Sequence, residues 1–366
     1  INDEQGVKAM KTCALLLLAN FLFCGLAPAE GSACTTFVLG EKNNQVFGRN
    51  YDWDVEDALV IINKRGMAKS SYPNPAEKGT PARWVSKYGS VTFNQYGREL
   101  PTGGMNEAGL IVETMALSEA RYPRPDDRPF LGSALQWRQF LLDNYARVSE
   151  VIASDALVRI SPRRTGLGIH VLLSDRGGDC ASIEFLDGEM VVHTGSQLPV
   201  RALTNDTYAN SIYHWKNGKT PVMDPGQSIG RFILAADMLE QYDAQKVNGP
   251  TDYAFKILDA VSARRTVWRI VYDNVNMKIF FLTRANPAMR TIDVARLDFS
   301  CQTPVQVIDI NTPLTGNITD RFENYTRQKN RTLIENSFRK TSFLRNYSDA
   351  ALDRLADFPD STTCNP

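Results

Sequence analysis

Short runs of apolar and β-branched residues, separated by polar or glycine-containing turns, follow one another over the first third of the chain, which is typical of β-strands. The segments with this pattern are residues 35–39, 45–50, 59–63, 90–95 and 110–115. A short polar turn joins the first two segments, and a glycine-rich turn at residues 102–109 separates the last two. Because short turns join strands of opposite direction, we expect antiparallel hairpins here.

Helical spacing predicts a helix over residues 132–145 and a shorter one over residues 149–157. Strand patterns then return, with Asp187 and Gly188 as a hairpin turn. These later strands are residues 170–174, 181–186 and 190–193. Two further helices are expected at residues 228–242 and 252–263. A final hairpin is expected at residues 266–273 and 277–283.

This order of elements is typical of a layered α+β fold, in which two antiparallel sheets pack face to face with helices outside. Residues 34–316 are predicted to form this domain. Residues 317–366 are charged and helical in pattern, and we expect them to pack on the domain as a C-terminal tail.

The start of the chain has the features of a secretion signal. From Met10 a short basic start leads into apolar residues 14–26 and then into small residues, with Gly31 and Ala33 at the positions that a signal peptidase reads. The apolar run is shorter than the roughly 20 residues of a membrane span. We therefore predict that residues 1–33, an upstream remnant and a signal peptide, are removed, and that the protein is periplasmic or secreted.

Charge and cysteine usage exclude several functions. Lys and Arg balance Asp and Glu at 41 each, so we expect no nucleic-acid binding. An oxidising compartment permits one disulfide among Cys180, Cys301 and Cys364, and the sequence leaves the pairing open. With three histidines and no Cys/His cluster, we expect neither a zinc site nor a cofactor.

Removal of the signal would make Cys34 the first residue, with a thiol and a free α-amine in one residue. The α-amine has an ordinary pKa of about 7.7 to 8, so it can act as general base for its own thiol near neutral pH. Arg49 and Asp52 lie on the next strand, and a hairpin brings both beside Cys34. There Asp52 would orient the α-ammonium, and Arg49 would lower the thiol pKa or bind a carbonyl or carboxylate.

The same residues have ordinary structural interpretations. Arg49 and Asp52 would form a partly exposed ion pair at a strand end, and Cys34 would be a small buried residue. Spacing alone does not separate these interpretations from the catalytic one.

Five motifs follow one another along the chain: residues 34–36 (CTT), 47–52 (FGRNYD), 104–110 (GMNEAGL), 203–206 (LTND) and 228–232 (SIGRF). In order and spacing they resemble the choloylglycine hydrolase family, which contains bile salt hydrolases and penicillin V acylases. The resemblance extends from Cys34 to about residue 311. It implies an N-terminal nucleophile hydrolase with an αββα sandwich that cleaves linear C–N amide bonds.

By matching position, Cys34 resembles the nucleophile and base of that family, and Arg49 and Asp52 resemble the residues that hold its amine and thiol. Asn205 resembles the side-chain donor of the oxyanion hole, and Arg231 the second arginine near the nucleophile. One preorganised donor of this kind is worth about 3 to 4 kcal/mol. From the residues alone, Asn205 also suits a turn, and Arg231 suits a solvated position near a helix start.

The family pattern fails at Ala116, where relatives carry Asn, Tyr or Trp in the pocket. An alanine side chain donates no hydrogen bond, so we expect a backbone N–H or a water as the second oxyanion donor and a wider pocket. Trp53, next to Asp52, is a candidate wall for an apolar acyl chain; its alternative is an ordinary core aromatic. We interpret Asn106, in its glycine-rich segment, as a turn former.

We therefore predict an exported cysteine amide hydrolase for a small N-acyl substrate of the bile-salt-conjugate, penicillin V or N-acyl homoserine lactone type. A homo-oligomer, tetramer or dimer, is expected, without stable membrane insertion. The alternative is a lipid-anchored or soluble non-catalytic binding protein on the same fold, although Gly31 stands where a lipidation signal usually has leucine. A free α-amine at Cys34 is expected for the enzyme, whereas a blocked or uncut Cys34 is expected for the binding protein.

Overall fold

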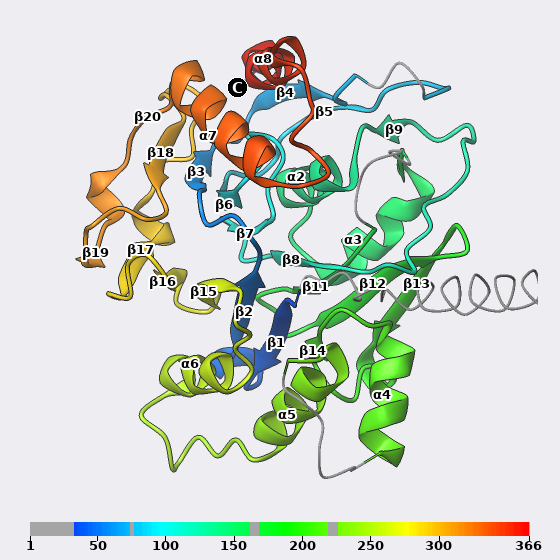
Figure 1. Ribbon diagram of the computed structural model, residues 1–366, viewed down its shortest axis with the longest axis vertical. Helices are drawn as coiled ribbons and strands as arrows, with labels where there is room; N and C mark the ends of the chain where they lie inside the picture. The colour runs from blue at the N-terminus through cyan, green and yellow to red at the C-terminus, as the bar shows by residue number, and fades with distance from the viewer. Residues whose placement is uncertain (1–32, 74–76, 162–167, 219–225, 366) are drawn as a thin grey trace, which may run out of the picture. The chain divides into compact units, whose positions relative to one another are not determined.

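The computed structural model describes residues 33–73, 77–161, 168–218 and 226–365. Apart from Ala33, the predicted signal segment lies outside these residues, so its removal stays a prediction. Two large sheets form the centre of the described fold, and helices lie on their outer faces (Figure 1). Within these ranges, no helix is both long and apolar enough to cross a membrane.

The first sheet has seven strands and carries the N-terminal hairpin. In spatial order they are β14 (Ala202–Leu203), β1 (Thr35–Leu39), β2 (Val46–Asp52), β15 (Thr266–Asp273), β16 (Lys278–Thr283), β17 (Arg290–Asp293) and β19 (Gly316–Asn317). Neighbours run antiparallel except β17 and β19. Thr35 lies opposite Asn50, and Thr36 lies opposite Arg49. This register brings the end of β2 back to the start of β1.

The second sheet has nine strands, all antiparallel to their neighbours. In order they are β13 (Glu189–Thr194), β12 (Cys180–Leu186), β11 (Ile169–Ser174), β8 (Ile111–Ala116), β7 (Gly103–Asn106), β6 (Ser90–Asn94), β3 (Leu59–Asn63), β18 (Gln306–Asp309) and β20 (Glu323–Asn324). Successive side chains of β3 point to opposite faces of the sheet. Val60 and Ile62 lie in the core shared with the first sheet, whereas Leu59 and Ile61 pack against Leu333 on the outer face.

Helices complete the four layers of an αββα sandwich, so the predicted fold class is confirmed. On the first sheet lie α5 (Ser228–Glu240) and α6 (Pro250–Ala260), with α4 (Tyr208–Asn217) beside α5. The second sheet is covered by α2 (Ala134–Asn144), α3 (Val148–Ala153) and α7 (Arg327–Lys340), and α8 (Asp349–Asp357) packs on α7. Short 3-10 turns are Lys42–Asn44, Ser154–Ala156, Gly195–Gln197, Val294–Arg296, Thr319–Arg321 and Phe358–Ser361.

Hydroxyl side chains mark where several helices begin. Ser133, Thr207, Thr326 and Ser348 each accept a hydrogen bond from the backbone N–H three residues later. Each bond satisfies one of the N–H groups that the first helical turn leaves without a partner. Helix α6 begins differently, with Gly249 at a φ of 113° followed by Pro250 in the first helical position.

Strand β7 and helix α4 are two of the elements that the sequence prediction missed. Residues 103–106, predicted as part of a turn, form strand β7, because glycine is needed there for close packing rather than for turning. A Cβ on Gly103 would lie 2.1 Å from Oε2 of Glu113, and a Cβ on Gly104 would lie 2.4 Å from the Val91 carbonyl oxygen. The sequence prediction also missed helix α4, although Tyr208, Ile212 and Trp215 recur at helical spacing and pack against the core of the first sheet.

The C-terminal residues are tied to the domain by a disulfide between Cys301 and Cys364. The pairing that the sequence left open is thus Cys301 with Cys364, and Cys180 is a buried free thiol whose pKa burial raises to about 12. Cys364 lies in β21 (Thr363–Cys364), which pairs with β4 (Met67–Ser70) and, beyond it, β5 (Arg83–Val85). The remaining small sheet joins β9 (Phe130–Leu131) and β10 (Arg159–Ile160). The boundary predicted between residues 316 and 317 stays a prediction.

Candidate active site at the start of β1

Cys34 lies immediately before β1, in the core between the two sheets. Its side chain is buried, and its Sγ lies 3.9 Å from the backbone carbonyl oxygen of Asp52. Burial raises the pKa of the thiol, and Arg49 opposes this effect. The β1–β2 hairpin therefore brings the predicted nucleophile and both of its predicted partners together.

Asp52 is the last residue of β2 and is fully buried. Neither carboxylate oxygen has a partner in hydrogen-bond geometry among the described residues. Burial raises the pKa of Asp52 to about 6, although the Thr266 hydroxyl, Arg231 and Arg49 act to lower it. The interpretation of Arg49 and Asp52 as a partly exposed ion pair is wrong, because both are buried and no ion pair joins them.

Arg49 points from the first sheet to the second. Its Nη1 donates to the backbone carbonyl of Thr114, and its Nε lies 3.4 Å from Oε2 of Glu113. Its guanidinium carbon also lies 5.1 Å from the centre of the Tyr51 ring. Although burial acts to lower the pKa of Arg49, Cys34 and Glu113 raise it overall. The result is a fixed positive charge beside the thiol.

Arg231 reaches the site from α5. Its Nε donates to Oγ1 of Thr35 at 3.2 Å, and its Nη2 donates to Oδ1 of Asn205 at 3.0 Å. The side chain is 1% exposed, so the interpretation as a solvated residue is wrong. Burial lowers the pKa of Arg231, and Asp52 and Cys34 oppose this effect.

Asn205 lies in the bend between β14 and α4 and is held from three sides. Its Oδ1 accepts from Arg231, its backbone N–H donates to Oγ of Ser228 at 2.8 Å, and its Nδ2 donates to the carbonyl of Ala116 at 2.9 Å. One hydrogen on Nδ2 remains for a further acceptor. Asn205 is thus both a bend residue and a rigidly held amide donor.

Ala116 ends β8 and is half-buried, with its backbone carbonyl on Asn205. Trp53 follows Asp52 and is also half-buried, with its ring centre 6.4 Å from that of Tyr51. Tyr51 in turn stacks on Trp268 at 4.3 Å. An aromatic cluster thus adjoins the end of β2.

Asn106 has the structural role that the sequence indicated. Its Oδ1 accepts from the backbone N–H groups of Ala108 and Leu110, which shapes the turn after β7. Its Nδ2 donates to the carbonyls of Leu142 and Tyr145 and joins that turn to the end of α2. All of its bonds serve the fold.

Glu113 was missed by the sequence prediction. It is buried between Arg49 and the hydroxyl of Tyr272, which donates to it at 2.5 Å. Burial raises its pKa, and Arg49 opposes that effect. A single carboxylate in the otherwise uncharged strand Ile111–Ala116 was the signal that would have identified it, because such a group needs a buried partner.

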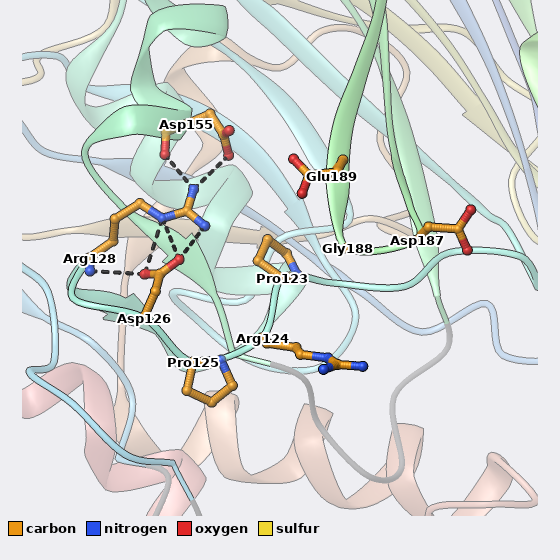
Figure 2. A pocket seen from close by; sticks show the side chains of 9 residues that line it. All are labelled: Pro123, Arg124, Pro125, Asp126, Arg128, Asp155, Asp187, Gly188 and Glu189. Carbon is orange, nitrogen blue, oxygen red and sulfur yellow. Dashed lines mark hydrogen bonds and ion pairs between the residues drawn. The ribbon is translucent and has the colours of Figure 1, made fainter.

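A surface hollow of about 430 Å³ lies elsewhere and contains none of these residues (Figure 2). Its lining residues are Pro123, Arg124, Pro125, Asp126, Arg128, Asp155, Asp187, Gly188 and Glu189. Arg128 pairs there with Asp126 at 2.7 Å and with Asp155 at 3.2 Å. In the part of the chain that the structure describes, no group of three His, Cys, Asp or Glu side chains is arranged to hold a metal ion.

Comparison with known proteins identifies relatives with the same architecture. Residues 34–220 match the family described as linear amide C–N hydrolases, choloylglycine hydrolase family. A penicillin V acylase of Pectobacterium atrosepticum is 27% identical over 351 residues, which cover 82% of this chain and 90% of that protein. The structure of penicillin V acylase from Agrobacterium tumefaciens superposes with a TM-score of 0.68 at 29% identity, covering 80% of this chain and 98% of that one.

A conjugated bile acid hydrolase variant from Clostridium perfringens has the same fold. Its TM-score is 0.62 at 17% identity, with 77% of this chain and 98% of that chain covered. At this identity the likeness concerns the fold alone.

Proposed function

Since the chain belongs to the linear amide C–N hydrolases of the choloylglycine hydrolase family, we propose that it is an exported hydrolase of N-acyl amides whose N-terminal nucleophile is Cys34. The substrate types proposed are bile-salt conjugates, penicillin V and N-acyl homoserine lactones. Two relatives described as penicillin V acylases support the second type.

The observation that carries the proposal is the buried, unpaired carboxylate of Asp52 beside Cys34. A buried charge without a partner is costly, and pairing with an opposite charge offsets this cost. In the uncut chain the Cys34 nitrogen is an amide with one hydrogen. After cleavage it becomes an α-ammonium with three N–H donors, and the Asp52 carboxylate can accept hydrogen bonds from them. Cleavage before Cys34 would therefore supply both the general base and the positive charge that Asp52 lacks.

The reaction then follows from the residues present. The α-amine takes the thiol proton, and the thiolate attacks the amide carbon to form a C–S bond. The oxyanion that develops accepts the remaining hydrogen of the Asn205 amide, which Arg231 and Ala116 already hold in place. The C–N bond breaks as the ammonium proton passes to the departing amine. Water, deprotonated by the same α-amine, hydrolyses the thioester and restores the thiol.

Export is supported by the disulfide between Cys301 and Cys364, because such bonds persist in oxidising compartments. We propose a periplasmic or secreted protein on this ground and on the signal pattern of residues 10–33. A homo-oligomer stays a prediction, and light scattering on the exported protein tests it.

The test is N-terminal sequencing and intact-mass analysis of the exported protein, with amine release measured on a panel of N-acyl amides. We expect a chain that begins at an unmodified Cys34 and turns over at least one amide. Cys34→Ser should abolish turnover. Cys180→Ser, at the other free thiol, is the matched control and should retain it. A blocked, lipidated or uncut Cys34 would favour the non-catalytic binding protein instead.

A further inference from the structure

A buried histidine and glutamate hold both ends of the segment that carries Asn205. His170 on β11 places Nδ1 2.9 Å from Oε1 of Glu184 and Nε2 2.6 Å from the carbonyl oxygen of Thr204. Both side chains are fully buried. The proposed reaction does not use them.

Glu184, on β12, extends the contact to the other end of the segment. Its Oε1 accepts the backbone N–H of Tyr208 at 2.9 Å, at the start of α4. Its Oε2 lies 3.9 Å from Nε2 of His193 on β13. The pair thus holds the carbonyl of Thr204, directly before Asn205, and the N–H of Tyr208, three residues after it.

The opposite side of this segment is held by α5. Oγ of Ser228 donates to Oγ1 of Thr204 at 3.0 Å and accepts the N–H of Asn205 at 2.8 Å. With the carbonyl of Thr204 fixed by His170, the peptide plane between Thr204 and Asn205 is determined from both sides. The direction of the Asn205 side chain follows from that plane.

We propose that His170 is a positioning residue: by donating from Nε2 to the Thr204 carbonyl, it sets the peptide plane that aims the Asn205 amide at the reacting carbonyl. The catalytic consequence rests on the proposed function, in which Asn205 stabilises the oxyanion. The positioning of Asn205 by His170 does not depend on the proposed reaction and can be tested without it.

The contact requires a proton on Nε2, because a carbonyl oxygen only accepts. In 15N spectra of the wild-type protein labelled at histidine, we expect a protonated Nε2 for His170. An unprotonated Nε2 would overturn the proposal, since no donor to Thr204 would remain. This measurement needs neither a variant nor activity.

Two substitutions separate the contacts of the ring. His170→Gln keeps an amide nitrogen near the position of Nε2, whereas His170→Asn keeps one near Nδ1 and leaves the Thr204 carbonyl without a donor. We expect His170→Asn to lower kcat about 100-fold with KM nearly unchanged, and His170→Gln to restore most of this loss. Ser182→Ala is the matched control, because its hydroxyl is buried on the same strand as Glu184 without a partner, and it should leave kcat unchanged.

Crystal structures of the variants give a readout that is independent of turnover. In His170→Asn the contact from Nδ2 of Asn205 to the Ala116 carbonyl, 2.9 Å in the parent, should open, and in His170→Gln it should persist. An unmoved Asn205 or an unchanged kcat in His170→Asn overturns the proposal. If the parent hydrolyses no amide on the panel, the proposed function fails, while the spectra and the crystal structures still decide the positioning.

Discussion

The side-chain amide of Asn205 donates to the backbone carbonyl of Ala116 at 2.9 Å. Ala116, where the resemblance predicts a departure from the family, is therefore in contact with the proposed oxyanion donor. The backbone carbonyl of Ala116 accepts from Asn205 and so orients it, whereas the methyl side chain of Ala116 supplies no second donor to the oxyanion.

Asn205→Ala removes the proposed side-chain donor to the oxyanion. We expect kcat to fall about 100- to 1000-fold with little change in KM, because the lost bond forms only in the transition state. Steady-state kinetics on an accepted amide measure both constants. Asn217→Ala, at the exposed end of α4, should match the parent, and an Asn205→Ala enzyme that also matches it would exclude this role.

Ala116→Tyr places a ring at the position where the resemblance implies a larger side chain. We expect the ratio of kcat/KM values for bulky over small acyl groups to fall about 10-fold or more, because the ring competes with the bulky group for space. A series of N-acyl amides with one leaving amine isolates this effect. Equal losses across the series would contradict a pocket at this position.

Asp52 should make the uncut chain less stable as pH rises. Its pKa is raised from 3.8 to about 6 in the folded chain, which therefore binds a proton here more tightly than the unfolded chain does. The contribution of protonated Asp52 to the free energy of unfolding is complete below about pH 4 and is lost as pH rises through about 6. The loss is on the order of 3 kcal/mol.

In the uncut chain, Asp52→Asn should therefore be more stable than the parent at neutral pH and about equal to it below about pH 4. Urea unfolding at both pH values measures the difference, with exposed Asp54→Asn as the control. The gain should shrink in the cut chain, where the α-ammonium of Cys34 pairs with the carboxylate. The same gain in both forms would argue against that pairing.

Loss of the Cys301–Cys364 disulfide should destabilise the fold. The bond joins residues 63 apart in the sequence, and closing a loop of this length in the unfolded chain corresponds to about 4 kcal/mol. We expect the double variant Cys301→Ser, Cys364→Ser to lose stability of this order in urea unfolding. Reducing agent should lower the parent to the same level, and a parent that reductant leaves unchanged would refute the assignment.

Local pattern was sufficient to predict the hairpin that holds Cys34, Arg49 and Asp52. Their β-rich composition defined both strands, and one short polar turn between them predicted the hairpin whose register the structure gives. Sequence alone could not show that Asp52 lacks a partner or that Arg231 is buried, because both properties depend on packing against distant elements. Strand β7 was missed for a related reason: the need for glycine at residues 103 and 104 comes from Glu113 and a neighbouring strand.

The histidine and glutamate behind Asn205 were beyond sequence reasoning. His170 and Glu184 lie 14 residues apart in the chain, and Thr204 lies 34 residues after His170. Only the pairing of β11 with β12 and the return of the chain at β14 bring the three together. The sequence contains only three histidines, and burial decides which of them is structural.

The separations within the site also set an order of assembly. Cys34 and Asp52 are 18 residues apart, whereas Thr35 and Arg231 are 196 apart. Short loops close faster than long ones, so the nucleophile and its carboxylate meet early, and the amide donor and second arginine arrive only with the finished sandwich. A nascent or damaged chain would thus carry a thiol but no complete catalytic apparatus. Turnover would therefore report complete folding rather than the presence of the thiol.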